Sequence, residues 1–341
     1  MPNQNLVIIN NEKIFKESGS FYCSNLDLKV LPEELNSYYK VEYIVRNSKK
    51  KGTQEIKLKN IKTTSNFLKL FYLIIKTFKN KDTKYLLISI TPYTFIAFLI
   101  LFLFRKKIFI YLFSSGHEEY RHILGSFFVW IYHVMYVITT SFSEVIVCHK
   151  RLFNKEKSHV VYISRLDDQW QVNHKNAPLS KIKYLYVGRM SAEKGIFEFL
   201  KMFDKLKMDA ELSIVGDSEK YNFANKNIKL LGYIANPQLL INIYDNHNIM
   251  VLPSFTEATP YVVDESLSRK RPVIIFEDID YIVRDKIGIF VCKRDIDSFS
   301  KTTNYIMSNY LEIQKNMEKN TLPTKKSMIK QISDIINLQN S

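Results

Sequence analysis

The sequence has few cysteines and no segment typical of export. Its three cysteines, Cys23, Cys148 and Cys292, lie far apart, are odd in number and lack metal-ligand spacing. This usage fits a reducing cytoplasm best. Residues 1–5 carry no basic charge, and the apolar run that follows them, Leu6–Ile9, is short. The N-terminus therefore predicts a first β-strand rather than a signal peptide.

The sequence also lacks an uninterrupted apolar run that is predicted to cross a membrane. Tyr85–Phe104 has twenty residues without a charge, which is the length of a transmembrane helix. However, Thr91-Pro92 divides it into Leu86–Ile90, which fits a buried strand, and Tyr93–Phe104, which is too short to span. Another apolar run, Ile108–Phe113, follows as in a β-α-β unit. A soluble α/β protein is therefore favoured over a membrane-spanning one.

Several segments of the first half nevertheless suit a membrane surface. Phe95–Phe104 is apolar on all sides, whereas a surface helix normally keeps a polar face, and Arg105-Lys106-Lys107 follow it. Residues 46–84 are rich in lysine and include an amphipathic patch at Phe67–Phe78. Gly125–Ser143 is a second uncharged run. We expect this half to rest on a bilayer, and the sequence leaves open whether residues 93–104 and 125–143 touch lipid.

The charge of the chain is unevenly distributed. The 341 residues have a formal net charge of +15. Residues 1–165 hold 25 Lys/Arg and 12 Asp/Glu, whereas residues 166–341 hold 24 and 22. A coding bias toward lysine would raise the lysine content of both halves equally. The asymmetry in net charge therefore predicts an anionic partner for the first half, either a membrane surface or a nucleic acid. Nothing resembles a groove-reading helix or a base-stacking platform, so we expect no nucleic acid.

The order of apolar runs predicts two α/β domains, which the length also suits. In the second half, runs typical of buried strands alternate with amphipathic helices. Strands are expected at 182–187, 212–215, 228–233, 249–252 and 273–276, and helices at 196–206 and 237–246. We place the domains at residues 1–168 and 169–305. Residues 306–341 are predicted to form a helical tail that packs back on the first domain.

One stretch, Pro253–Ile274, combines the features of a ligand site. Its pattern predicts a strand, a turn, a helix that begins near Tyr261 and a further strand. Glu257 then lies in the loop and Glu265 in the first turns of the helix, so both carboxylates can face one cleft. The N–H groups at the helix start can bind an anion. Carboxylates for sugar hydroxyls beside a positive helix end for phosphate suggest a nucleotide-sugar site.

Four short motifs occur in a fixed order between residues 182 and 292. They are Gly188-Arg189-x4-Lys194-Gly195, Val215-Gly216-Asp217, Leu231-Gly232-Tyr233 and Pro253-Ser254-x2-Glu257-x7-Glu265. In this order and spacing they resemble the C-terminal half of the family 4 retaining glycosyltransferases of GT-B fold. The opening turn and strand of the chain resemble capsule and O-antigen transferases of that family. The resemblance implies an α/β protein of GT-B fold, with two Rossmann-like domains and a cleft between them.

The resemblance assigns roles to four charged residues. Arg189 and Lys194 resemble the cations that stabilise the leaving diphosphate without a metal. Glu265 resembles the residue that binds the ribose, and Glu257 resembles the one that contacts the donor sugar. On composition alone, all four are ordinary surface charges or helix-start charges. Their order in the chain is what favours the functional interpretation.

Backbone and loop positions complete the set in the second half. The family's loop presents backbone N–H groups to the sugar and phosphate, and Pro260 has no N–H. The donors are therefore expected at Thr259, Tyr261 and Val262. Gly216 is predicted to let the backbone approach the nucleotide, and Tyr233 marks the loop where the family holds the base.

The first half contributes two further candidates. His117, in the polar loop Ser114–Glu119, aligns with a histidine that reaches the donor sugar, and Gly19 aligns with the glycine loop near the diphosphate. Two positions depart from the family pattern. Ser218 stands where a second glycine is common, and Ser164-Arg165-Leu166-Asp167 stands where many members have Asn-Gly before the aspartate.

These expectations define a function. We expect a retaining glycosyltransferase of hexosyl type that moves a sugar from a nucleotide donor, such as a UDP-sugar, to a membrane-held, polyprenyl-linked glycan in surface polysaccharide biosynthesis. Attack is expected on the face that the nucleotide leaves, with a phosphate oxygen accepting the proton. No metal or other cofactor is expected. We expect the enzyme in the cytoplasm, at the inner face of the plasma membrane, and the sequence leaves donor, acceptor and linkage open.

Three alternatives remain from the sequence. The chain could be a catalytically silent nucleotide-sugar binder or assembly scaffold of GT-B fold. A non-hydrolysing epimerase shares that fold, but the Glu257 and Glu265 pattern favours transfer. Asp278-Ile279-Asp280 resembles the Asp-x-Asp of metal-dependent GT-A transferases. It lies late in a GT-B-like context, and two aspartates after a strand usually mark a turn.

Overall fold

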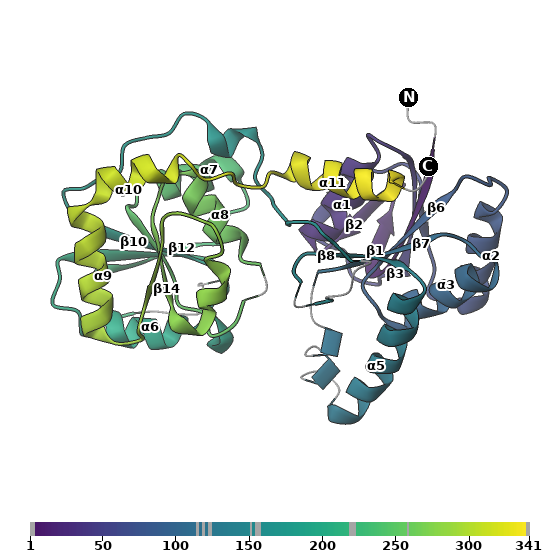
Figure 1. Cartoon of the computed structure of the whole chain (residues 1–341), viewed down its shortest axis with the longest axis horizontal. Helices are drawn as coiled ribbons and strands as arrows, with labels where there is room; N and C mark the ends of the chain where they lie inside the picture. Colours follow the sequence, from purple (N-terminus) through teal and green to yellow (C-terminus); the bar gives the residue numbers. More distant parts are fainter. Residues whose placement is uncertain are drawn as a thin grey trace. The chain divides into compact units, whose positions relative to one another are not determined.

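The computed structural model of the chain contains two compact units (Figure 1). It describes residues 4–113, 116–117, 120–121, 125–150, 152–153, 158–217, 223–257 and 259–338, apart from the side chains of residues 26–28. The first unit comprises Met1–Tyr162 and Lys326–Ser341, and the second comprises Ile163–Lys325. Residues 306–325, which the sequence-based division assigns to the tail, therefore group with the second unit.

The first unit is built around a nine-stranded sheet. The strand order is β4-β2-β1-β6-β7-β8-β9, while β3 pairs with β1 and β5 with β3. The strands are β1 (Asn5–Glu17), β2 (Ser20–Cys23), β3 (Lys40–Asn47), β4 (Gln54–Ile56), β5 (Ile61–Thr63), β6 (Lys84–Ile88), β7 (Ile108–Leu112), β8 (Glu144–Val147) and β9 (Ser158–Val160). Apart from the antiparallel pairs β1–β2 and β2–β4, the strands pair in parallel. This unit is α/β, as predicted.

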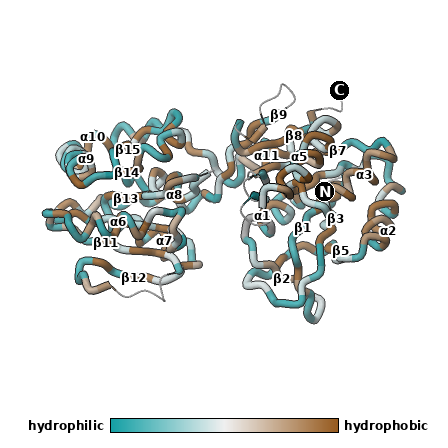
Figure 2. Tube along the Cα trace, turned by 90° about the horizontal axis from the view of Figure 1, so that it is seen from below, coloured by the Kyte–Doolittle hydropathy of each residue, from teal (hydrophilic) through white to brown (hydrophobic). Residues whose placement is uncertain are grey.

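Helices pack on both sides of this sheet. They are α1 (Leu26–Leu35), α2 (Phe67–Thr77), α3 (Pro92–Leu103), α5 (Ser126–Ser141) and α11 (Lys325–Asn337). Helices α2, α3 and α5 share one buried apolar core with the sheet, and Figure 2 shows hydrophobic residues along α2. On α11, the Ser333 carbonyl accepts from the Tyr39 hydroxyl (3.0 Å) and the Ile336 carbonyl from Lys84 Nζ (3.0 Å). The last helix thus packs on the first unit.

The break predicted at Thr91-Pro92 is confirmed. Strand β6 ends at Ile88, and α3 begins at Pro92 with Thr91 as its N-cap. The N–H of Thr94 donates to Thr91 Oγ1 (3.2 Å) and the N–H of Thr91 donates to Thr94 Oγ1 (2.9 Å), a capping box that fixes the helix start. Within the described residues, no helix combines the length and the apolar character that crossing a membrane requires.

Strand β1 extends well beyond the predicted strand Leu6–Ile9. It pairs in parallel with β3 and β6, shifts register between Ile9 and Lys13, and ends in antiparallel pairing with β2. Ser18 (φ 48°) and Gly19 (φ 89°) form the connecting turn. Two successive positive φ angles are typical of a tight hairpin turn, for which glycine is suited. Sequence reasoning missed this extension because the bulge interrupts the apolar run.

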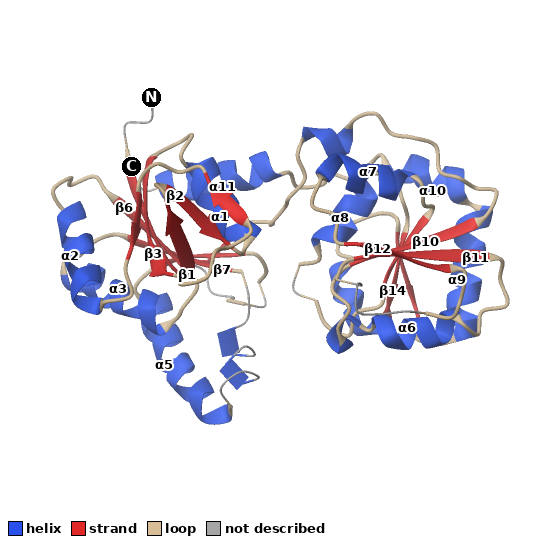
Figure 3. Cartoon of the chain, turned by 180° about the vertical axis from the view of Figure 1, so that it is seen from behind, coloured by secondary structure: helices blue, strands red, loops and turns tan. Residues whose placement is uncertain are grey.

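The second unit has a six-stranded parallel sheet in the order β12-β11-β10-β13-β14-β15. The strands are β10 (Ile182–Val187), β11 (Ala210–Val215), β12 (Ile228–Gly232), β13 (Ile249–Leu252), β14 (Val273–Phe276) and β15 (Ile289–Cys292). Figure 3 shows helices around this sheet. They are α6 (Ile196–Phe203), α7 (Pro237–Asp245), α8 (Tyr261–Ser268), α9 (Ile296–Ser308), α10 (Tyr310–Met317) and the short turns η1 (Asp168–Gln171), η2 (Ala192–Lys194) and η3 (Glu277–Ile282). The predicted strands and helices of this half are confirmed.

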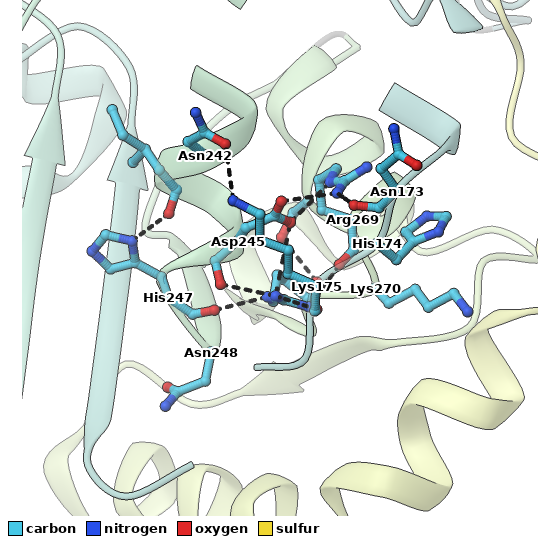
Figure 4. Close-up of polar contacts among 12 residues, drawn as sticks. Asn173, His174, Lys175, Asn242, Asp245, His247, Asn248, Arg269 and Lys270 are labelled. Atoms are coloured by element: carbon cyan, nitrogen blue, oxygen red, sulfur yellow. Dashed lines mark hydrogen bonds and ion pairs between the residues drawn. The ribbon is translucent and has the colours of Figure 1, made fainter. Parts of the chain in front are cut away.

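A buried ionic cluster fixes the chain that enters the second unit (Figure 4). Arg269, which follows α8, donates from Nε and Nη2 to the two carboxylate oxygens of Asp245 (2.9 and 2.8 Å). Its guanidinium also donates to the carbonyls of Trp170, Val172 and Asn173. Arg271 donates to the carbonyls of Lys175 and Asp245 (2.9 Å each). Residues 170–175 are therefore held against the C-terminal end of α8.

Candidate functional site

The four motif segments of the second unit lie at the carboxyl ends of β10, β11, β12 and β13. The sheet order places β10 beside both β11 and β13, so the direction in which successive strands are added reverses between β10 and β13. Open α/β sheets bind ligands outside the carboxyl ends of the strands at such a switch point. Gly188 follows β10 and Pro253 follows β13. The segments that carry Lys194 and Glu257 therefore both start at this point.

Close backbone packing explains Gly216. Its N–H donates to the Gly232 carbonyl (3.0 Å), and its φ is +150°. A Cβ at this position would stand 1.9 Å from the carbonyl oxygen of Gly188. Glycine is thus required where the ends of β10 and β11 meet. The approach of a nucleotide to Gly216 stays a prediction, as does the role of Tyr233, whose side chain is exposed beside Gly232.

Lys194 and Glu257, which lie 63 residues apart, meet in a salt bridge. Lys194 Nζ lies 2.7 Å from Glu257 Oε1, and the two side chains are 22% and 7% exposed. Gly195 makes this approach possible. It has φ +62°, and a Cβ there would stand 1.9 Å from the Pro253 carbonyl oxygen. The turn that carries Lys194 can therefore pack directly on the end of β13.

The Glu257 carboxylate is held in a defined orientation. Ser254 Oγ donates to Glu257 Oε1 (2.6 Å), the same oxygen that Lys194 contacts. The hydroxyl of Tyr281 accepts from the Glu257 N–H (3.0 Å) and donates to the Glu257 carbonyl (2.6 Å). Among the residues that the structure describes, none donates to the second carboxylate oxygen, Oε2. This oxygen is the one that suits a ligand hydroxyl.

Arg294 holds the loop after β13, and sequence reasoning missed it. Its Nη1 donates to the Pro253 carbonyl (2.9 Å), and its guanidinium lies over the rings of Phe255 and Phe276, 4.2 and 4.3 Å from their centroids. Asp278 forms a salt bridge with its Nη2 (2.6 Å). The first aspartate of the Asp-x-Asp alternative is therefore engaged with an arginine that positions the Glu257 loop.

Arg189 lies apart from this salt bridge. Its side chain is 73% exposed and contacts Glu193 (3.2 Å). Ser191 also donates to Glu193 (2.7 Å), and this hydrogen bond, together with the Arg189 charge, lowers the pKa of the Glu193 carboxyl. Lys194 and Glu257 are thus brought together, while the guanidinium of Arg189 extends into solvent.

Glu265 lies in α8, which begins at Tyr261 as predicted. Its side chain is buried, and its Oε2 accepts from the hydroxyl of Tyr244 (2.9 Å). Burial raises the pKa of Glu265, while the Tyr244 hydrogen bond and the nearby Arg165 charge oppose that rise. The structure thus places this carboxylate in the helix but does not test its predicted contact with a ribose.

The three expected backbone donors lie at the start of α8. Pro260 is the N-cap, and no side chain caps the helix there. The hydroxyl Oγ1 of Thr259 is buried without a hydrogen-bond partner among the described groups. The guanidinium of Arg165 stacks over Tyr261, 4.2 Å from the ring centroid. Val262 packs partly against the core. Arg165 belongs to the segment that departs from the family pattern, so sequence reasoning gave it no role.

The two candidates of the first unit differ in their surroundings. His117 Nε2 lies 3.1 Å from His133 Nδ1, and the His117 ring meets the rings of Tyr132 and Tyr136 edge to face. Burial, followed by the charges of His133 and Arg121, lowers the pKa of His117.

Gly19, by contrast, is the hairpin turn residue described above, with nothing within 4 Å of a Cβ built there. Within the polar loop around His117, Ser114, Ser115, Glu118 and Glu119 lie outside the described residues, as does Ser218 of the second unit.

Comparison with known proteins finds that much of the second unit is similar to glycosyltransferase sequences. Residues 167–322 match the family model described as Glycosyl transferases group 1. The chain is 35% identical over 98 residues to the teichuronic acid biosynthesis glycosyltransferase TuaC of Bacillus subtilis. The aligned region covers 28% of this chain and 25% of TuaC. The chain is 26% identical over 140 residues to the capsular polysaccharide biosynthesis glycosyltransferase CapM of Staphylococcus aureus, covering 36% of each. The chain thus spans between a quarter and slightly more than a third of the length of these relatives.

Solved structures with the same fold cover nearly the whole chain. A sucrose-phosphate synthase from Thermosynechococcus elongatus has a TM-score of 0.67 at 12% identity, covering 98% of this chain and 99% of that one. Anabaena Alr3699/HepE in complex with UDP and glucose has a TM-score of 0.68 at 13% identity, covering 98% and 100%. The predicted fold class, α/β of GT-B type with two Rossmann-like domains, is confirmed.

Proposed function

We propose that this protein is a retaining, metal-independent glycosyltransferase of surface polysaccharide biosynthesis. It transfers a hexosyl group from a nucleoside diphosphate sugar to a hydroxyl of a membrane-held, polyprenyl-linked glycan. The bond between the anomeric carbon and the diphosphate oxygen breaks, and the acceptor oxygen bonds to the same face of that carbon. The acceptor's proton passes to the departing phosphate oxygen, so the nucleoside diphosphate leaves with it.

The observation that carries the proposal is the salt bridge between Lys194 and Glu257 at the switch point of the second sheet. Each side chain is partly or largely withdrawn from solvent, and each is neutralised by the other. In the proposed donor complex, Lys194 turns to the diphosphate, where its charge stabilises the leaving group. Glu257, still oriented by Ser254 and Tyr281, accepts hydroxyls of the sugar. The donor thus replaces one ion pair by two charge-assisted contacts.

The relatives support this choice of donor and pathway. TuaC and CapM are named as glycosyltransferases of teichuronic acid and capsular polysaccharide biosynthesis. HepE is described in complex with UDP and glucose. We therefore propose a UDP-sugar as donor, bound through Glu265 and the start of α8. We place the enzyme in the cytoplasm, peripheral at the inner face of the plasma membrane, because its acceptor is held there.

A thermal-shift screen against UDP, GDP, ADP and their sugars tests the donor site. A ligand at a hundredfold excess over its Kd stabilises the folded state by about 2.7 kcal/mol, so UDP and a UDP-sugar should raise Tm clearly. Stabilisation by none of these ligands would contradict the proposal. The anomeric configuration of the product, measured by NMR, tests retention, and an inverted product would contradict the mechanism. Binding without transfer to any lipid-linked acceptor would favour a silent binder.

A further inference from the structure

Three neighbouring helices of the first unit present large apolar side chains to solvent. Helices α2, α3 and α5 bury their inner sides in one core against the sheet. Their outer sides remain exposed, and Leu68 on α2 and Leu103 on α3 are 82% and 74% accessible. The other exposed large apolar residues of these helices and their C-caps are Phe67, Phe71, Tyr72, Leu99, Phe102, Phe104, Phe127, Phe128, Trp130, Val134, Val137 and Phe142. Monomeric soluble proteins rarely expose so much apolar surface in one region.

Helix α5 exposes its N-terminal half. It projects away from the sheet in Figure 1, and the side chains of its first turns are exposed while Tyr132 and Met135 are buried. Phe127 and Trp130, in those first turns, are 70% and 66% exposed. The helix contains no Lys, Arg, Asp or Glu. No carboxylate, ammonium or guanidinium group of this helix therefore opposes contact with hydrocarbon.

The three helices are linked at their other ends by aromatic contacts. Phe102 and Phe142 lie with ring centroids 4.8 Å apart, and Phe78 and Phe104 lie 5.2 Å apart. The ammonium of Lys106 lies over the Phe78 ring at 4.6 Å. Aromatic rings beside lysines are typical of a membrane interface, where the rings lie at headgroup level and the charges reach the phosphates.

The charge of these segments distinguishes between two possible partners for such an apolar face, a second copy of the chain and a lipid bilayer. Residues 66–107, which include α2 and α3, contain eight Lys/Arg and one Asp/Glu. A second copy of the chain would bring these like charges together, which is unfavourable. An anionic bilayer attracts them, with about 1 kcal/mol per Lys or Arg near the surface. The charge pattern therefore favours a lipid surface over a dimer.

We propose that α2, α3 and α5 form a lipid-binding face that enters the headgroup and upper acyl region of an anionic bilayer without crossing it. Phe127, Phe128 and Trp130 are its deepest residues. This proposal rests on the proposed function in one respect, which is the choice of membrane: an enzyme that acts on a membrane-held acceptor must lie at the membrane that holds it. Lipid binding can be measured without donor, acceptor or turnover, so each proposal can fail alone.

The protein carries its own probe for this face. It has two tryptophans, of which Trp170 is buried in the second unit and Trp130 is exposed on α5. Full-length protein is mixed with vesicles of phosphatidylcholine with about 30% phosphatidylglycerol, with and without bromine on the acyl chains. We expect brominated vesicles to quench the emission, and Trp130→Phe to abolish quenching while the protein still binds. Binding without quenching in the wild type would overturn the proposal.

Matched substitutions separate apolar insertion from charge. Phe127→Ser with Phe128→Ser should raise the vesicle Kd tenfold or more. Leu311→Ser should leave the Kd unchanged, although this leucine of α10 is as exposed as Phe127. Lys69→Gln with Lys79→Gln should raise Kd and reduce its salt dependence, whereas Lys301→Gln with Lys319→Gln in the second unit should not. Circular dichroism checks that each variant is folded. A lipid-free dimer in sedimentation velocity that Phe127→Ser with Phe128→Ser dissociates would overturn the proposal in favour of a second copy.

Discussion

Lys194 Nζ lies 2.7 Å from Glu257 Oε1, although the two residues belong to segments that follow different strands of the second sheet. Gly195 allows the approach, and Ser254 and Tyr281 hold the carboxylate in place. The salt bridge joins the segment after β10, which carries the predicted cations, to the segment after β13, which carries the predicted carboxylates. Substitutions at this point should therefore affect turnover more than folding.

Lys194→Ala removes the cation that we place on the leaving diphosphate. Loss of one such electrostatic contact typically costs 100- to 1,000-fold in kcat, and we expect a fall of that order in a transfer assay. Tm should change little, because Ser254 still donates to Glu257 and the lysine is partly solvated. Lys205→Ala, at an exposed position after α6, is the control. An unchanged kcat in Lys194→Ala would point to a binder or scaffold.

Gly195→Ala tests whether the backbone approach sets the salt bridge. An L-residue at φ +62° costs roughly 1–2 kcal/mol, and the added Cβ would meet the Pro253 carbonyl at 1.9 Å. The loop must shift, so we expect a loss of stability in urea unfolding together with a loss of kcat/KM. Gly232→Ala has a similar positive φ of +71° but open space around its Cβ, and in urea unfolding it should show only the backbone cost. Equal losses in the two variants would contradict this account.

The local structure of the second unit was predictable from sequence, and much of the site's support was not. Tyr261 as the start of α8 follows from Pro260, which ends the preceding loop and can begin a helix. Lys194 and Glu257 were associated through the order of the motifs. No local pattern reveals that Arg294 reaches back 41 residues to Pro253, or Tyr281 back 24 residues to Glu257. Such contacts depend on the packing of one strand end against the next.

The same limit applies to the first unit. The Thr91-Pro92 break was visible because proline and a capping threonine act locally. The extension of β1 past a bulge was not, because the residues that pair with β2 are not an alternating apolar run. For the same reason Gly19 was assigned to a ligand loop on resemblance, whereas its positive φ has a local cause in the hairpin turn. Its predicted contact with a diphosphate stays a prediction.

Asp278→Ala and Asp280→Ala distinguish the arginine clamp from the metal alternative. Asp278 binds Arg294, which holds the Pro253 carbonyl, whereas Asp280 is an exposed residue of η3. We expect Asp278→Ala to lower kcat/KM several-fold by loosening the loop, and Asp280→Ala to behave like the wild type. Both variants and the wild type should keep their rates in EDTA. Comparable losses in the two variants, with Mn²⁺ dependence, would favour a metal site instead.

The buried carboxyl of Glu265 gives a pH dependence with a defined sign. Burial raises its pKa above the ordinary value of 4.5, so the folded protein binds this proton more tightly than the unfolded chain. The free energy of unfolding should therefore fall as pH rises from about 4.5 through the folded pKa. Glu265→Gln keeps an acceptor for the Tyr244 hydroxyl but does not ionise, so its unfolding free energy should fall less over this range.

Urea unfolding between pH 4 and 8 measures that difference. Asp264, whose pKa burial also raises, is present in both proteins, and its charge adds to the rise in the pKa of Glu265. The difference between the two proteins therefore reports the coupled pair of carboxyls. Glu198→Gln, at an exposed position of α6, should retain the slope of the wild type. In calorimetry, Glu265→Gln should also bind UDP at least tenfold more weakly if the carboxylate accepts the ribose hydroxyls. Unchanged binding would leave Glu265 with a structural role only.

Asp245→Asn tests whether the buried ionic cluster of Figure 4 stabilises the second unit and the candidate site. Arg269 and Arg271 are fully buried and share this carboxylate. Without it, two guanidinium charges lie in the interior with only carbonyl acceptors, and breaking a buried pair in this way typically costs about 3–5 kcal/mol. Hydrogen exchange should show lost protection in residues 170–175, which the two arginines hold.

The solvent-accessible salt bridges of Glu211 with Lys229 and Lys181 provide the matched control. Glu211→Gln should cost less than about 1 kcal/mol, because solvent screens surface salt bridges. If Asp245→Asn cost no more than this control, the carbonyl hydrogen bonds alone would fix the two arginines. Arg269 of the cluster follows directly on α8, four residues after Glu265. If Asp245→Asn costs more than the control, it should therefore also weaken UDP binding through Glu265, without any contact between Asp245 and the ligand.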